Sequence, residues 1–196
     1  MTDKPPGDAG ARPGDGQHRL FFALLPDVAV RDSIANAAAL LKANFDVTGR
    51  WILPAEYHVT LRFLGEDSRL NQLLVERASA AAASVRMDAF DLVFDRASSF
   101  HGAKPPWVLR CPEPAEPLHR LWRLLDSALA AEGVRAESEL NFVPHITVLR
   151  HADKQLEECP IDPIVWPVRG FALMHSQPGK PRRYVELGRW PISAIG

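Results

Sequence analysis

Two short segments of the sequence combine a histidine and a threonine in the same way. His58 and Thr60 lie in the run HVTLR, and His145 and Thr147 lie in the run HITVLR. With seven histidines and four threonines among 196 residues, about 0.14 His-x-Thr matches are expected by chance, yet there are two. A proline lies within four residues upstream of each histidine. The repetition indicates that the two motifs act together.

Both motifs occur in apolar runs that predict β-strands, over residues 58–64 and 145–149. Because residues i and i+2 of a strand point to the same face, each motif presents an imidazole and a hydroxyl together. Two such strands facing each other would form a four-residue cage with approximate two-fold symmetry. The cage suits a phosphodiester, because in-line displacement at phosphorus needs a base on one side and an acid on the other. Histidine fills both roles near neutral pH, and the hydroxyls can donate to the non-bridging oxygens.

An arginine follows each motif, Arg62 after the first and Arg150 after the second. Either guanidinium can add charge-assisted hydrogen bonds to a phosphate, but Arg62 shares the face of His58 only if the strand stays regular. No Asp or Glu accompanies the histidines at metal-ligand spacing in either motif, so we expect no metal and no cofactor. The other histidines are interpreted as surface or packing residues: His18, His101, His119, His151 and His175.

Strands and helices must surround the motifs to position them. Apolar runs predict further strands at residues 19–25, 90–94, 107–111, 168–175 and 183–188, with a short extended piece at 51–53. Helices are predicted at 27–43, from about 68 to 85, and at 117–132. We expect Asp27 to cap the first helix, Asp67 or Ser68 to cap the second, and Gly133 to end the third. Because the elements do not alternate strictly, an α+β fold with mainly antiparallel sheet is favoured.

The composition is that of an ordinary globular protein, with 46% hydrophobic and 24% charged residues. Residues 1–17 differ, because they contain four glycines and three prolines and no Val, Ile, Leu, Phe, Trp or Tyr. Such a segment cannot bury enough apolar surface to offset its ordering entropy. We therefore predict a disordered tail over 1–17 and a single two-lobed domain over 18–196.

Charge and cysteine content limit the partners and the compartment. A net charge of −1 argues against non-specific coating of long nucleic acids, which needs a broad basic face. Two isolated cysteines, Cys111 and Cys159, form neither a disulfide framework nor a zinc motif. No apolar run approaches the length of a membrane span and no signal pattern is visible. We expect a cytoplasmic monomer without a membrane partner.

The sequence resembles the two-histidine phosphoesterase superfamily and, within it, the RNA 2′,3′-cyclic phosphodiesterases, also called 2′-5′ RNA ligase-like or LigT/ThpR-type proteins. The resemblance covers the runs RLFFALLP, YHVTLRFLGE and FVPHITVLR, and the closing pattern around Ser176, Tyr184 and Trp190. It implies a bilobal α+β fold with a pseudo-two-fold repeat, in which two antiparallel sheets surround a central cleft and helices lie outside.

The resemblance also implies a reaction, the metal-independent hydrolysis of a 2′,3′-cyclic phosphate at an RNA end to a 2′-phosphate. By this resemblance His145 is the base that activates water and His58 is the acid that protonates the 3′ oxygen. Thr60, Thr147 and Arg150 would bind the phosphate. Some members also join tRNA halves through a 2′-5′ linkage in the reverse type of reaction.

Three alternatives stay open at this point. The same chemistry can act on small cyclic nucleotides or on ADP-ribose cyclic phosphate, the chain can be a non-catalytic module that binds RNA ends, or the histidines can be metal ligands. Lys180, Arg182 and Arg183 form either a solvated hairpin tip or a contact to the RNA backbone. Phe22, Trp107 and Tyr184 either stack a base or belong to the core.

Overall fold

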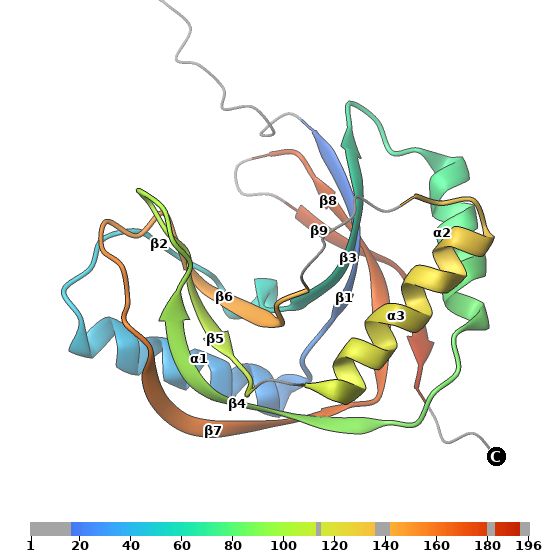
Figure 1. The fold of residues 1–196 in the computed structure, drawn as a ribbon. Helices are drawn as coiled ribbons and strands as arrows, with labels where there is room; N and C mark the ends of the chain where they lie inside the picture. Colours follow the sequence, from blue (N-terminus) through green and yellow to red (C-terminus); the bar gives the residue numbers. More distant parts are fainter. Residues whose placement is uncertain (1–16, 113–114, 136–141, 180–182, 193–196) are drawn as a thin grey trace, which may run out of the picture.

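The computed structural model describes residues 17–112, 115–135, 142–179 and 183–192. These segments form nine strands, three α-helices and one short 3₁₀ helix, η1 (Figure 1). In chain order they are β1 (His18–Leu24), α1 (Val28–Asn44), β2 (Arg50–Trp51), η1 (Pro54–Glu56), β3 (Val59–Asp67), α2 (Gln72–Ser84), β4 (Phe90–Ser99), β5 (Trp107–Arg110), α3 (Glu116–Ala131), β6 (His145–Arg150), β7 (Cys159–Val168), β8 (Gly170–Gln177) and β9 (Arg183–Pro191).

The strands follow one hydrogen-bonded path in the order β7-β4-β5-β6-β3-β1-β8-β9, and β2 pairs with β6 at the side. Every pair of neighbours is antiparallel. In the described segments β3 and β6 are bridged only at Val59 and Ile146, so the path consists of two four-stranded halves. This arrangement confirms the expected antiparallel α+β fold, and the two expected sheets are the two halves.

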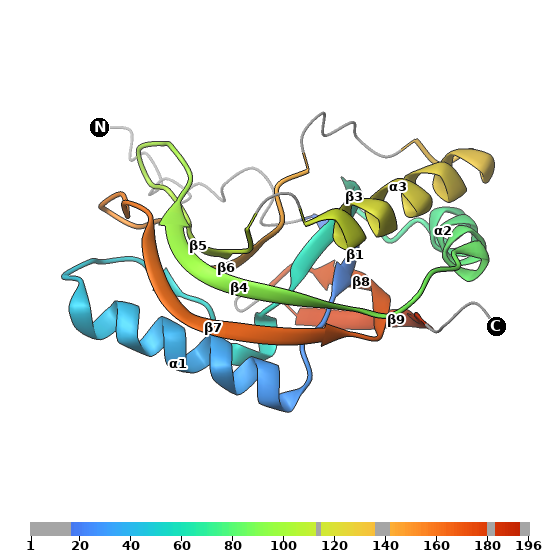
Figure 2. The same cartoon turned by 60° about the horizontal axis from the view of Figure 1, so that its bottom comes forward.

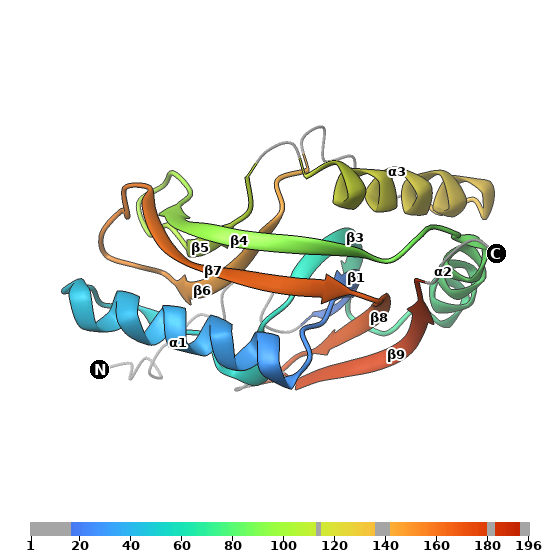
Figure 3. The same cartoon turned by 90° about the horizontal axis from the view of Figure 1, so that it is seen from below.

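Helices α1 and α3 cross between these halves, as the three views show (Figures 1, 2 and 3). Helix α1 follows β1 of one half but packs against β7 of the other, through a buried face of Val30, Ile34, Ala37, Ala38 and Leu41. Helix α3 follows β5 but packs against β3 and α2. Its leucine stripe, at Leu118, Leu121, Leu125 and Leu129, is fully buried. The reciprocal crossing agrees with the expected two-fold repeat.

The helix ends follow their local chemistry. The Asp27 side chain accepts a hydrogen bond from the Val30 amide at 2.9 Å, which confirms it as the N-cap of α1. Gly133, with a φ of 70°, ends α3 in the left-handed conformation that favours glycine. The predicted cap of α2 was wrong, because β3 continues through Asp67 and Asn71 accepts from the Leu74 amide at 3.0 Å instead.

The sequence also gave no prediction for β7. Its three prolines, Pro160, Pro163 and Pro167, disfavour a strand that must donate on both sides. Because β7 lies at the edge of the path, its outer amides need no strand partner and the prolines are tolerated there.

The first sixteen residues lie outside the described part of the chain, so the disordered tail and the domain limit at residue 18 stay predictions. Among the described residues, no helix combines the length and apolar character needed to cross a membrane.

Candidate active site

The two His-x-Thr motifs meet where β3 lies against β6. Val59 and Ile146, each directly after a histidine, are paired across the two strands and fully buried. Continuing this antiparallel register by one residue places His58 opposite Thr147. One residue in the other direction, the same register places Thr60 opposite His145. By this register the four side chains lie on the face opposite to that of the buried Val59 and Ile146, and their joint action as a cage stays a prediction.

Both histidines are oriented by the same backbone contact. Nδ1 of His58 lies 2.7 Å from the carbonyl oxygen of Glu56, and Nδ1 of His145 lies 2.8 Å from that of Val143. A carbonyl oxygen only accepts, so in each ring Nδ1 carries the hydrogen and Nε2 keeps its lone pair when the ring is neutral. The repeated contact two residues upstream gives both imidazoles the tautomer that takes and returns a proton at Nε2.

The surroundings of His58 strongly lower the pKa of its imidazole. Burial lowers the pKa of His58 from 6.5 to about 4, against the opposing effect of its hydrogen bond to Glu56. The charges of Arg150 and His145 lower this pKa further. Their influence shows that both residues lie close enough to His58 to interact with its charge. In the protein without a ligand, His58 is therefore neutral at pH 7.

A small cavity surrounds the exposed side of His58. It is lined by Arg50, Ile52, Glu56, His58, Thr147, Arg150 and Tyr184. Arg150 thus lines the same cavity as His58 and Thr147, and its role as a phosphate ligand stays a prediction. Among the described residues, the buried Nε of Arg150 has no hydrogen-bond partner. An anion in the cavity would supply one.

Arg62 lies elsewhere, because β3 does not stay regular. The partners of Phe22 and Ala23 in β3 are Arg62 and Thr60, so Leu61 is bulged out of the register. The bulge turns Arg62 away from the face of Thr60, and its guanidinium pairs with Asp126 and lies 4.4 Å from the centre of the Trp122 ring, both in α3. Arg62 is therefore no phosphate ligand but a buried contact between β3 and α3.

The same bulge reverses the direction that regular strand alternation would give to Phe63. Regular alternation would send this side chain into the main core with Val59. Instead Phe63 packs with Phe21, Ala23 and Met174 in a small separate cluster. This cluster lies beside the site, since the ring of Phe21 is 5.3 Å from that of His58.

Aromatic rings flank both histidines. Besides Phe21, Tyr184 of β9 lies 6.0 Å from His58 between ring centroids, and Phe100 meets His145 edge-on at 4.9 Å. No local sequence pattern points to Phe21 or Phe100, because their closeness to the histidines depends on long-range packing. Phe100 directly precedes the exposed His101, so this loop lies next to His145.

The other described residues that the sequence suggested for RNA contacts or for packing lie either in the core or at the surface. Phe22 and Trp107 are 0% and 1% exposed and cannot stack a base, whereas the half-buried Tyr184 lines the cavity. His175 is buried and lies 2.7 Å from His18 between ring nitrogens, as expected for a packing residue. Lys180 and Arg182 lie outside the described residues, and Arg183 is exposed at the start of β9.

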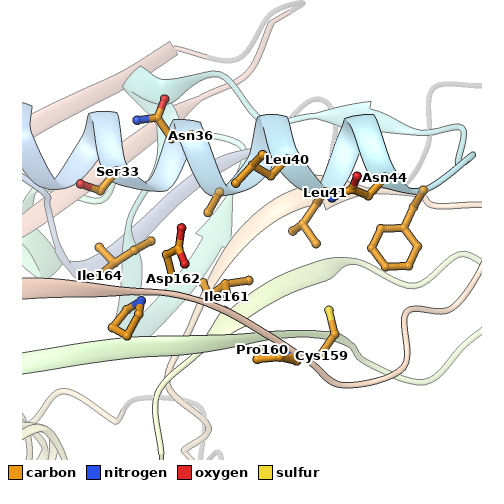
Figure 4. A pocket seen from close by; sticks show the side chains of 13 residues that line it. Ser33, Asn36, Leu40, Leu41, Asn44, Cys159, Pro160, Ile161, Asp162 and Ile164 are labelled. Atoms are coloured by element: carbon orange, nitrogen blue, oxygen red, sulfur yellow. The ribbon is translucent and has the colours of Figure 1, made fainter.

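A larger cavity lies away from this chemistry, between α1 and β7 (Figure 4). It has a volume of about 660 Å³, and Asp162 is its one charged lining residue in the described part of the chain. The described residues that line it include no histidine and no cation that would attract a phosphate, so the histidine pair remains the candidate site. Within the described segments, no three His, Cys, Asp or Glu side chains gather in a group that could hold a metal ion.

Comparison with known sequences agrees with this geometry. The family model described as the 2′-5′ RNA ligase superfamily matches residues 30–180. The RNA 2′,3′-cyclic phosphodiesterase of Aquifex aeolicus is 29% identical over 122 residues, which are 60% of this chain and 64% of that protein. The protein of the same name from Bacillus subtilis is 30% identical over 102 residues, 52% of this chain and 55% of that one. The matches thus span less than two thirds of either curated relative.

Solved structures show the same fold over more of the chain. The crystal structure of E. coli LigT complexed with 3′-AMP superposes with a TM-score of 0.77 at 28% sequence identity. The match covers 91% of this chain and 99% of that chain. The fold around the histidine pair is therefore shared with a protein that binds a nucleotide.

Proposed function

Because the chain belongs to the 2′-5′ RNA ligase superfamily, we propose that it hydrolyses 2′,3′-cyclic phosphate ends of RNA to 2′-phosphates, using His58 and His145 as its acid–base pair. One observation carries the proposal: the β3–β6 register brings the two motifs together, and in each motif the same backbone contact holds Nδ1, so that the lone pair of the neutral ring lies at Nε2. The names of the two curated relatives support the choice of substrate.

The reaction follows from two histidines that face one phosphorus. Nε2 of His145 takes a proton from water as the water oxygen bonds to phosphorus. The bond between phosphorus and the 3′ oxygen breaks on the opposite side, and Nε2 of His58 gives its proton to that oxygen. The product carries a 2′-phosphate and a free 3′ hydroxyl. The order of the two histidines rests on the family resemblance, since the two-fold arrangement is symmetric.

The remaining site residues would hold the phosphate. In this proposal the hydroxyls of Thr60 and Thr147 donate to the two non-bridging oxygens, one from each strand. Arg150 supplies a charge-assisted hydrogen bond from a guanidinium that is only partly satisfied. None of these contacts needs a metal, and we propose a metal-independent reaction. Of the three aromatic residues that the sequence suggested for base stacking, Tyr184 lines the cavity. Its ring is available to stack on the terminal base.

The low pKa of His58 is consistent with an acid that becomes protonated when the substrate binds. The free protein holds His58 neutral at pH 7, because burial lowers its pKa and the positive charge of Arg150 adds to that effect. A cyclic phosphate brings a negative charge against the same ring, which raises its pKa. The anion thus favours protonation of His58 only when there is a leaving oxygen to protonate.

We also propose that the protein works as a monomer in the cytoplasm. Both cysteines, the buried Cys111 and the partly buried Cys159, are free thiols, as expected in a reducing compartment.

Turnover of defined substrates tests the proposed function. The intact protein, treated with excess chelator, is incubated with an RNA oligonucleotide that ends in a 2′,3′-cyclic phosphate, a cyclic mononucleotide and ADP-ribose cyclic phosphate. We expect the RNA end to be hydrolysed with the highest kcat/KM, and adding an RNA with a 5′ hydroxyl tests for 2′-5′ joining. Binding of the RNA end without turnover would support the end-binding module, and activity lost with chelator and restored by zinc would support the metal alternative.

A further inference from the structure

Two arginines face each other at the rim of the proposed site. Strand β2 pairs with β6 so that Arg50 lies directly opposite Arg150, and both side chains line the cavity that contains His58. Residues paired in this way have Cβ atoms roughly 5 Å apart, and like charges in such positions repel each other. A pair of this kind is stabilised by an anion that both arginines contact or by an anion on each.

Among the described residues, the one carboxylate that lines the cavity, that of Glu56, balances the two positive charges only in part. Glu56 lies 3.3 Å from Nη1 of Arg50, at the long end of the hydrogen-bonding range. The Arg50 side chain is 53% exposed, so its other donors can reach an acceptor from solvent. The described lining residues of the cavity thus include two guanidinium groups and one carboxylate, and this excess of positive charge favours an anion.

We propose that Arg50 binds the phosphate that precedes the cyclic phosphate in an RNA chain, while Arg150 contacts the cyclic phosphate itself. This inference rests on the proposed function. Arg150 is the arginine whose charge acts on His58, which places it beside the reacting phosphorus. Arg50, on the more exposed side of the pair, is suited to the next phosphate along the strand. The site thereby distinguishes an oligonucleotide end from a nucleoside cyclic phosphate.

A different role for Arg50 must be separated from this one. Glu56 contacts Arg50 through its carboxylate and His58 through its carbonyl, so Arg50 can also act as a positioning residue for His58. That role would affect every substrate equally, because all of them need His58. Binding of a second phosphate affects only substrates that have one.

The experiment compares two substrates that share a terminal base. One is cytidine 2′,3′-cyclic phosphate, and the other is the dinucleotide CpC ending in the same cyclic phosphate. The quantity measured is the ratio of kcat/KM for the dinucleotide to kcat/KM for the nucleoside. Arg50→Gln is compared with the unchanged protein and with Arg189→Gln, a matched control whose side chain is 52% exposed and paired with Glu186 on β9.

We expect Arg50→Gln to lower this ratio by about three- to tenfold, the effect of one partly exposed charge-assisted contact. Arg189→Gln should leave the ratio unchanged, and Glu56→Gln should keep the preference for the dinucleotide. The ratio of the unchanged protein should also fall as salt is raised. The inference is overturned if Arg50→Gln has the same ratio of kcat/KM values as the unchanged protein. It is also overturned if Glu56→Gln lowers this ratio as much as Arg50→Gln does. Failure of the unchanged protein to turn over either substrate would instead contradict the proposed function.

Discussion

Val59 and Ile146 lie directly opposite each other where β3 meets β6, and each follows a histidine by one residue. In an antiparallel pair this contact has a local two-fold axis, which relates His58 to His145. The two-fold axis therefore passes through the proposed site. Its two apolar residues are fully buried, so the core fixes the register on which the chemistry depends.

Removing either histidine should abolish most of the activity. We expect His58→Ala and His145→Ala each to lower kcat by about 10²- to 10⁴-fold, the contribution of a positioned acid or base. Because the two residues act on one step, the double variant should lose little more than a single one. Single-turnover kinetics on a cyclic-phosphate RNA measure this, with the exposed His101→Ala as the control. Losses that multiply in the double variant would argue against a joint step.

The two threonines should be equivalent. Thr60→Val and Thr147→Val keep the β-branched shape and remove only the hydroxyl, so each should lower kcat/KM by about tenfold through the loss of one donor to the phosphate. The two-fold arrangement predicts similar losses for both variants. Steady-state kinetics measure the losses, and circular dichroism checks the fold. A full loss in one variant with no effect in the other would contradict the cage.

The titration of His58 should depend on ligand. NMR of the histidine rings should show a pKa near 4 in the free protein, because burial opposes the charged form. Inorganic phosphate or a 2′-nucleotide should raise that pKa, since the added negative charge favours the imidazolium. A pKa that falls on adding phosphate would contradict the placement of the anion beside His58.

The same depressed pKa has a consequence for stability. The unfolded chain takes up the His58 proton near pH 6.5, whereas the folded chain resists it down to about pH 4. The contribution of His58 to the free energy of unfolding is therefore fully present above pH 6.5 and falls as the pH drops from 6.5 to 4. Urea unfolding at several pH values should show this slope, and His58→Gln should make it shallower.

Arg62 should matter for stability. Asp126→Ala leaves its buried guanidinium without a carboxylate, at a cost of about 1–3 kcal/mol in the free energy of unfolding, since Asp126 itself is partly exposed. Arg62→Met should cost less, because it removes the charge together with the need for a partner and keeps a contact to Trp122. Urea unfolding measures both. A larger loss in Arg62→Met would show that the ion pair itself stabilises the fold.

The sequence predicted the parts of the site that depend on local pattern. Strand alternation placed each histidine beside its threonine, and the repeated motif indicated that the two strands meet. Arg62 shows the limit of that reasoning, because the bulge at Leu61 comes from pairing with β1, which leaves no mark in the motif. Arg50 joins the site through pairing with Arg150, a contact across 100 residues that local spacing cannot reveal.

The central claim is that the histidine pair adds water to a cyclic phosphate and releases the 3′ oxygen. Its most direct test is product analysis after hydrolysis of an RNA 2′,3′-cyclic phosphate in ¹⁸O-labelled water with excess chelator. We expect a 2′-phosphate that carries one ¹⁸O atom, formed by the intact protein and not by His58→Ala or His145→Ala. A 3′-phosphate product, or an unchanged cyclic end with the intact protein, would contradict it.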